Sequence, residues 1–252
     1  MNMNQRRERI VQLVNGGGSV SFSTLKKEFP QISEMTLRRD LEYLDQAKLL
    51  IRTHGGARSV EVLVGTDDLL PRRTQRNAQE KQQIAVKAAQ LLQENTTVFL
   101  DSGSTCTELA RAFPDGPYMI FTTSVGCAVD LARLQQPQVH MLGGQVNASS
   151  LSVNGAATLE WLSHINFDIA FMGVTGYIQS RGFTCGSEEE CAIKRAVIQR
   201  ADRVVLLMDA SKVGVTSTFT FADADRVSIL VTDGLLDEKT ERHLTACGIQ
   251  VL

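Results

Sequence analysis

The chain has 252 residues, a net charge of -2 and 43% hydrophobic residues, enough to bury one sizeable core and leave a small second domain. Its polar N-terminus and the lack of any run near the ~18 apolar residues of a transmembrane helix argue against secretion or membrane insertion, and predict a cytoplasmic protein. Five scattered cysteines without a C-x-x-C pair indicate neither a disulfide framework nor a zinc site, so we predict no cofactor and no metal.

Charge is unevenly distributed along the chain. Residues 1–58 carry 10 basic and 6 acidic side chains, a net of +4, which leaves 16 and 22, a net of -6, for residues 59–252. A polyanion would be attracted to the first segment and repelled by the second. An excess of four charges is also ordinary surface variation in a small domain, so charge alone does not decide between these interpretations.

The first segment has the pattern of a winged helix-turn-helix. A helix is predicted over residues 5–15, where apolar residues recur at helical spacing before three glycines. A second, short helix is predicted to begin at a Ser23 cap and run to Phe29, and a third to begin at a Ser33 cap. Alternating residues from Leu50 onward predict the strands of a small wing.

The third helix is typical of a DNA-recognition helix, because polar and basic side chains fill its first two turns while leucines at 37, 41 and 44 would face the core. Paired arginines in isolation more often belong to a solvated surface, but the surrounding pattern favours DNA contact. Either Arg38 or Arg39 is suited to a guanine edge or to a phosphate, and the sequence leaves open which. The residues predicted to bind DNA are Ser33, Met35, Thr36, Arg38, Arg39, Arg52 and His54.

The rest of the chain has the pattern of a layered α/β domain. We predict domains at 1–58 and 80–252, joined by a polar linker at 59–79. An amphipathic helix follows residue 80, and short apolar runs separated by helices predict a mainly parallel sheet. The predicted strands are residues 97–100, 118–122, 139–142, 169–174, 204–208 and 228–231.

Small, hydroxyl and charged residues follow several of these strands, where open α/β sheets bind ligands. The loop at 101–105 pairs a glycine with hydroxyls and opens a helix, which suits a phosphate, although such loops are as common without a ligand. Three glutamates at 188–190 are interpreted as the start of a helix rather than ligand contacts. The residues predicted to bind a ligand are Asp101, Gly103, Ser104, Thr105, Thr123, Ser124, Gly143, Gly144, Gly173, Asp209 and Lys212.

Two sets of motifs resemble a known family. Ser33-x-x-Thr36-x-Arg38-Arg39-Asp40-Leu41, with Leu44, Leu50, Arg52 and His54-Gly55-Gly56-Ala57, resembles the signature of the DeoR family of bacterial transcription regulators. Asp101-x-Gly103-Ser104-Thr105 and Asp209-x-Ser211-Lys212-x-Gly214 are similar to motifs of its sensor domain. The resemblance implies a winged helix-turn-helix followed by an α/β sensor domain similar to sugar-phosphate isomerases and CoA transferases, which binds phosphorylated sugars or related metabolites.

Three functions compete for this combination of domains. An isomerase-like or transferase-like enzyme with a DNA-binding appendage lacks a clear activated nucleophile, since all four histidines lie outside the glycine-rich loops. An architectural DNA-binding protein does not need so many anion-binding loops. We therefore predict a non-enzymatic, sequence-specific repressor of carbohydrate uptake or catabolism genes. It is expected to act as a homo-oligomer on a double-stranded DNA operator, controlled by a phosphorylated sugar or related metabolite.

Overall fold

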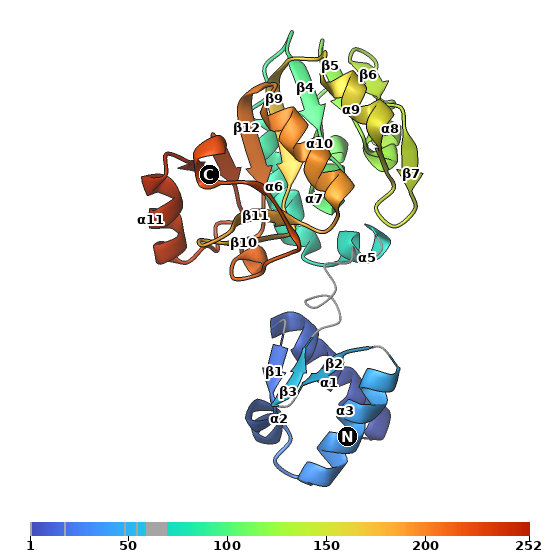
Figure 1. The fold of residues 1–252 in the computed structure, drawn as a ribbon, viewed down its shortest axis with the longest axis vertical. Helices are drawn as coiled ribbons and strands as arrows, with labels where there is room; N and C mark the ends of the chain where they lie inside the picture. The colour runs from blue at the N-terminus through green and yellow to red at the C-terminus, as the bar shows by residue number, and fades with distance from the viewer. Residues whose placement is uncertain (1, 18, 48, 54, 59–69) are drawn as a thin grey trace. The chain divides into compact units, whose positions relative to one another are not determined.

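The computed structural model describes residues 2–17, 19–47, 49–53, 55–58 and 70–252 (Figure 1). The chain divides into two compact units, Met1–Thr66 and Asp67–Leu252, and each is described by itself.

The N-terminal unit is a winged helix-turn-helix, as predicted. Its helices are α1 (Met3–Gly17), α2 (Phe22–Glu28) and α3 (Glu34–Gln46). Its strands β1 (Ser19–Ser21), β2 (Ile51–Thr53) and β3 (Gly56–Arg58) pair antiparallel in the order β1-β3-β2. The predicted core positions Leu37, Leu41 and Leu44 of α3 are buried against residues from α1 and α2.

The helix caps follow local hydrogen bonding. Ser33 caps α3 as predicted, and its Oγ accepts a hydrogen bond from the Thr36 backbone N at 3.2 Å. The prediction that Ser23 caps α2 is wrong. The chain turns directly from β1 into α2, so Ser21 takes the cap position and accepts from the Thr24 backbone N at 3.1 Å.

Gly56 lets two strands of this small sheet approach closely. A Cβ atom at this position would lie 2.0 Å from the Val20 carbonyl oxygen on β1. The wing strand can therefore pair with β1 only where residue 56 has no side chain.

The C-terminal unit is built on a seven-stranded parallel sheet in the order β15-β14-β12-β9-β4-β5-β6. Its strands are β4 (Thr97–Leu100), β5 (Met119–Thr122), β6 (Gln138–Met141), β9 (Phe167–Gly173), β12 (Ala201–Leu207), β14 (Ile229–Val231) and β15 (Gln250–Val251). All six predicted strands are present, within three residues at each end. The predicted α/β fold class is confirmed.

Helices cover both faces of this sheet (Figure 1). The flanking helices are α6 (Ala78–Ala89), α7 (Ser104–Ala112) and α8 (Val125–Leu131) on one face, and α9 (Ala156–Leu162) and α10 (Glu188–Ile198) on the other, with α11 (Glu238–Ala246) near the C-terminus. Strand β4 shows how the layers separate, because Val98 and Leu100 pack with the first set and Phe99 with the second. Continuous apolar strands are therefore buried from both sides.

Two small antiparallel sheets and two 3₁₀ turns were not predicted. The hairpin pairs β7 (Gln145–Asn147) with β8 (Ser152–Asn154), and a three-stranded sheet joins β10 (Gly176–Ile178), β11 (Gly182–Cys185) and β13 (Phe219–Ala222). The 3₁₀ turns are η1 (Ala210–Lys212) and η2 (Ala224–Arg226). These elements are three or four residues long and carry too few residues to show a period.

Residues 70–75, within the segment predicted as a linker, form helix α5 (Leu70–Gln75). Leu70 is buried, and its backbone N donates to the Ser149 carbonyl oxygen at 3.0 Å. The sequence pattern did not predict this helix because it is short and mostly polar. In the part of the chain that the structure describes, no helix is long and apolar enough to cross a membrane.

Candidate DNA interface and effector site

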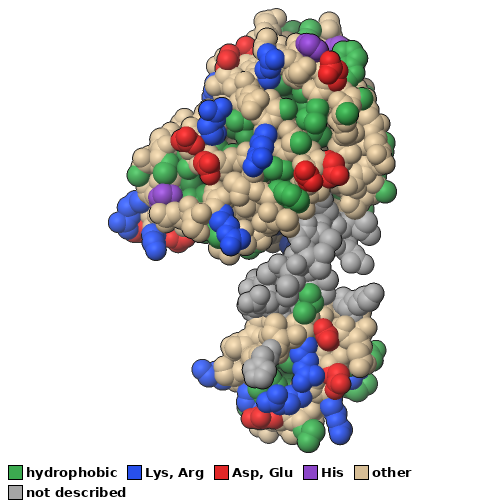
Figure 2. All heavy atoms as spheres, viewed as in Figure 1, with side chains coloured by type: hydrophobic (Ala, Val, Ile, Leu, Met, Phe, Trp, Pro, Cys, Tyr) green, Lys and Arg blue, Asp and Glu red, His purple; other side chains and the backbone are tan. Residues whose placement is uncertain are grey.

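The predicted DNA-binding residues of the third helix lie on or beside the exposed surface of α3. Met35 is 65% exposed, and Arg38 and Arg39 are also exposed. Ser33 and Thr36 are joined through their hydroxyls at 2.9 Å at the helix start. Figure 2 shows Lys and Arg side chains gathered on the visible face of this unit.

A buried carboxylate fixes α3 against α1. Asp40 is 2% exposed and accepts hydrogen bonds from Arg6 Nε at 2.6 Å and Arg7 Nε at 2.8 Å. The Arg7 guanidinium also lies over the Tyr43 ring, 3.7 Å from its centroid. The arginine run near the N-terminus is therefore partly structural, a role that helical periodicity alone does not reveal.

A groove separates α3 from the wing. Arg38 and Arg52 both line it, together with Phe22 and Asp45, and its volume is about 560 Å³. Asp45 Oδ1 accepts from the Arg52 backbone N at 2.9 Å, which ties β2 to α3. The structure thus brings two predicted DNA contacts to one groove, whereas predicted residue His54 lies outside the described residues.

The C-terminal unit has a cleft at the point where its chain order reverses. From β4 the chain continues to β5 and β6 on one side, and it later returns to β9 on the other. A crevice forms at the carboxyl ends of two strands that lead in opposite directions, and open α/β sheets bind ligands there. The cleft has a volume of about 60 Å³, on the same measure as the groove beside α3, and is lined by Arg73, Arg76, Lys81, Ser102, Gly103, Ser104, Thr105, Gly173, Val174, Thr175, Glu190 and Lys212.

The start of α7 opens onto this cleft. Gly103 occupies the N-cap position with φ 120°, so no side chain caps the first amide groups of the helix. Ser104 and Thr105 add hydroxyls to the lining. Backbone amides, hydroxyls and the positive end of the helix dipole together form an environment for an anion.

A buried ion pair lies at the base of the cleft. Lys194 Nζ on α10 contacts Oδ2 of Asp101, which directly follows β4, and it donates to the carbonyl oxygen of Gly173, the last residue of β9, at 3.0 Å. Asp101 Oδ2 also accepts from the Gly173 backbone N at 3.1 Å. Burial disfavours the ammonium, but the Asp101 and Glu190 carboxylates outweigh burial and raise the pKa of Lys194 above its usual value. Asp101, a predicted ligand residue, is therefore paired with Lys194 and is not among the residues that line the cleft.

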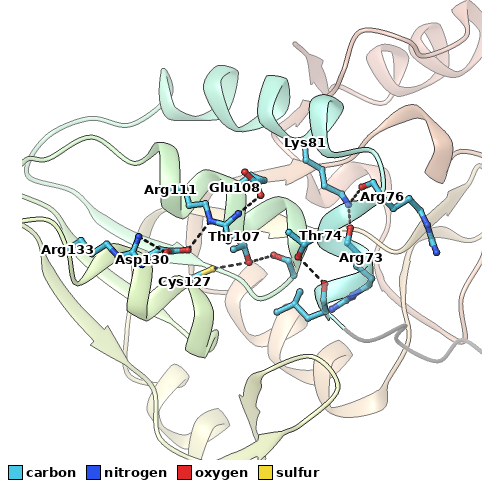
Figure 3. Close-up of polar contacts among 12 residues, drawn as sticks. Arg73, Thr74, Arg76, Lys81, Thr107, Glu108, Arg111, Cys127, Asp130 and Arg133 are labelled. Atoms are coloured by element: carbon cyan, nitrogen blue, oxygen red, sulfur yellow. Dashed lines mark hydrogen bonds and ion pairs between the residues drawn. The ribbon is translucent and has the colours of Figure 1, made fainter.

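Lys81 supplies a second buried cation. Its side chain is almost fully buried, and Nζ donates to the carbonyl oxygens of Arg73 and Arg76 (Figure 3). Burial, together with the nearby charges of Lys212, Arg76 and Arg73, lowers the pKa of Lys81 to about 8. A bound anion would offset the repulsion among these positive charges.

The other predicted ligand residues lie outside the cleft lining. Ser124 caps α8, accepting from the Cys127 backbone N at 3.2 Å, and Thr123 is buried beside it. The Gly143 carbonyl oxygen accepts a hydrogen bond from Thr158 Oγ1 at 2.8 Å. Residue 144 must be glycine because a Cβ atom there would lie 2.3 Å from Thr158 Oγ1. Asp209 caps η1 and accepts from Asn77 Nδ2 at 3.1 Å.

Sequence reasoning missed part of the cleft. Arg73 and Arg76 fell in the predicted linker, and Lys81 was not among the predicted ligand residues. Glu190 belongs to the acidic start of α10, as predicted, but it also lines the cleft and lies 3.2 Å from Lys194 Nζ. The available signal was the lysine four residues after Glu190, a spacing that brings both side chains to one helix face.

Metal ligands are not gathered anywhere within the described ranges, where no three His, Cys, Asp or Glu side chains are grouped to hold an ion. Four of the five cysteines are buried, and Cys247 is exposed. Burial raises the pKa of Cys127 to about 12, so this thiol stays protonated and unreactive near neutral pH.

Two family models match the chain, one for each unit. Residues 6–62 match the DeoR-like helix-turn-helix domain, and residues 76–234 match the DeoR C-terminal sensor domain.

Similar proteins cover nearly the whole chain. The HTH-type transcriptional regulator GlpR of Haloferax volcanii is 31% identical over 98% of this chain and 96% of its own length. The lactose phosphotransferase system repressor of Streptococcus mutans is 29% identical over 96% of each. Among solved structures, ribose 5-phosphate isomerase A from Methanocaldococcus jannaschii matches 54% of this chain and 55% of that chain, with 18% identity and a TM-score of 0.39.

Proposed function

The chain belongs to the DeoR family of transcriptional regulators, and on this premise we propose that it represses genes of carbohydrate uptake or catabolism. In this proposal the N-terminal unit binds a specific operator in double-stranded DNA. The C-terminal unit binds a phosphorylated sugar or a related metabolite, and this ligand controls operator affinity.

The cationic cleft at the reversal of strand order carries the proposal. Four basic side chains, from Arg73, Arg76, Lys81 and Lys212, line the same cleft as the uncapped start of α7. A phosphate would gain charge-assisted hydrogen bonds from these groups and from the helix amides. Glu190 adds a carboxylate that suits the hydroxyl groups of a sugar.

In this proposal the ligand controls operator affinity by shifting the protein between two conformations. A ligand shifts such an equilibrium only by the difference between its binding free energies for the two states. Shifting the population ratio of the two states from 1:99 to 99:1 requires a difference of about 5.5 kcal/mol. A homo-oligomer distributes this free energy over several ligand sites. It would also present paired helix-turn-helix units to a repeated or palindromic operator.

The test measures how known phosphorylated compounds change the affinity for DNA. A duplex selected by the purified protein is titrated in the presence of glucose 6-phosphate, fructose 6-phosphate, glycerol 3-phosphate or inorganic phosphate, and affinity is followed by fluorescence anisotropy. We expect at least one sugar phosphate to change DNA affinity by tenfold or more, and inorganic phosphate to change it less.

Lys212→Ala should keep DNA binding and lose this response, because it removes a cation from the cleft. Lys239→Ala is the matched control, since Lys239 is an exposed lysine of α11 that does not line the cleft. A Lys212→Ala protein that responds like the wild type would show that the effector binds elsewhere.

A further inference from the structure

The two exposed arginines of α3 have different surroundings. The Arg38 guanidinium lies over the Phe22 ring, with Cζ 4.5 Å from the ring centroid. It also lines the groove that contains Arg52 of the wing. Stacking on Phe22 therefore orients Arg38 toward α2 and the wing, at the margin of the recognition helix.

Arg39 lies on the opposite side of α3 from the core. Leu37 and Leu41 are buried, and Arg39 is two residues from each, about 200° around the helix. Met35, four residues earlier, shares its outer stripe and is 65% exposed. Among the described residues no hydrogen bond or ion pair holds the Arg39 guanidinium, so its planar fork can approach a base edge.

The arginines of α1, unlike Arg39, are each held by a carboxylate. Arg6 and Arg7 are bound to buried Asp40, and Arg9 lies 3.0 Å from Glu28. Asp40 in turn fixes the rotation of α3 about its axis. Adjacent residues of a helix lie about 100° apart, so Arg38 and Arg39 point in different directions. The Asp40 contacts fix both directions relative to the rest of the unit.

We propose that Arg39 contacts a base edge in the major groove and determines sequence preference, whereas Arg38 and Arg52 together bind a phosphate of the DNA backbone. The side of a recognition helix opposite its core enters the groove most deeply. A guanidinium at the helix margin, beside a second one in the wing groove, suits a phosphate oxygen. The assignment rests on the proposed DNA-binding function.

The experiment separates the two roles by base discrimination and by salt dependence. The full-length wild-type protein first selects 30-base-pair duplexes from a random pool. Affinities are then measured for the selected duplex and for each of its single base-pair substitutions, at several salt concentrations. The variants are Arg38→Ala, Arg39→Ala and the control Arg9→Ala, which removes an equal charge from α1.

Arg39→Ala should lose discrimination at one base pair, about 5-fold to 150-fold, while other preferences remain. Arg38→Ala should weaken binding to all duplexes by the same factor, and should reduce the slope of log affinity against log salt concentration by about 0.9. Arg38→Lys should restore the slope because it restores the charge, whereas Arg39→Lys should not restore full discrimination because lysine lacks the planar fork. Arg9→Ala should keep both properties.

The opposite results would overturn the assignment. It is wrong if Arg38→Ala abolishes a base preference, or if Arg39→Ala weakens all duplexes equally. If the wild-type protein enriches no sequence at all, the proposed DNA-binding function fails instead. The Lys variants keep the test decisive even if an alanine variant is poorly folded.

Discussion

Replacing Lys194 with methionine should destabilise the C-terminal unit by about 3–5 kcal/mol at pH 7, the usual cost of removing one partner of a buried ion pair. Lys194 and Asp101 are each 1% exposed. Methionine has a similar length and no charge. The variant therefore leaves the Asp101 carboxylate buried without its cation, and the Gly173 carbonyl without its lysine donor.

The pH dependence of this loss has a definite sign. Burial raises the pKa of Asp101, and without Lys194 nothing of comparable strength lowers it again. A carboxyl whose folded-state pKa lies above its unfolded value of 3.8 stabilises the fold only at low pH, and this contribution is lost as pH rises. The variant should thus be closer to wild type at pH 4.5 than at pH 7. In the wild type, the raised pKa of Lys194 keeps its contribution complete below about 10.5.

Urea unfolding followed by far-UV circular dichroism measures the effect, because most of the described helices and strands belong to the C-terminal unit. Adding Asp101→Asn to the variant should recover much of the loss, since the buried charge is removed with its partner. The control Lys239→Met, at an exposed position, should change stability by no more than about 0.5 kcal/mol. A Lys194→Met protein that loses less than about 1 kcal/mol, with the same loss at both pH values, would refute this reasoning.

Three further outcomes follow from particular residues. Anion binding in the cleft should raise the pKa of Lys81 from about 8, so the affinity for the effector should fall as pH rises through 8. Binding should then take up protons, which calorimetry in buffers of different ionisation enthalpy measures, and Lys81→Gln should remove this pH dependence. Gly56→Ala should unfold the wing or cost more than about 1 kcal/mol, because its Cβ would meet the Val20 carbonyl, and DNA binding should be lost while effector binding persists. Ser33→Ala should cost about 1 kcal/mol in thermal unfolding of the N-terminal unit, through loss of the α3 cap to Thr36, and unchanged stability there would remove the cap from the account.

The fold was predictable where local pattern and tertiary structure agree. Strand 97–100 was predicted at its observed bounds because Val98, Phe99 and Leu100 are buried from both sides and form a continuous apolar run. The Ser33 cap was predictable because one side chain satisfies one nearby amide. The Ser23 cap was not, because Ser21 competes for the same helix start and β1 decides between them.

The candidate site was less predictable because it is assembled from distant segments. Lys194 meets Asp101 across 93 positions of sequence, and only the order of strands brings them together. Gly143 and Gly144 follow a strand, as ligand loops do, but their strand β6 is at the edge of the sheet, away from the reversal of strand order. A strand-end pattern identifies candidate loops, whereas the sheet order selects among them.

The central claim is that a phosphorylated metabolite bound by the C-terminal unit controls specific DNA binding. The most direct measurement incubates the purified protein with sheared genomic DNA from its source, with and without the sugar phosphates named above, and sequences the retained fragments at near-physiological salt. The account predicts a few discrete sites beside carbohydrate genes, which are lost or gained when one sugar phosphate is present. Smooth, salt-sensitive retention without enriched sites, or discrete sites that no phosphorylated sugar affects, would contradict it.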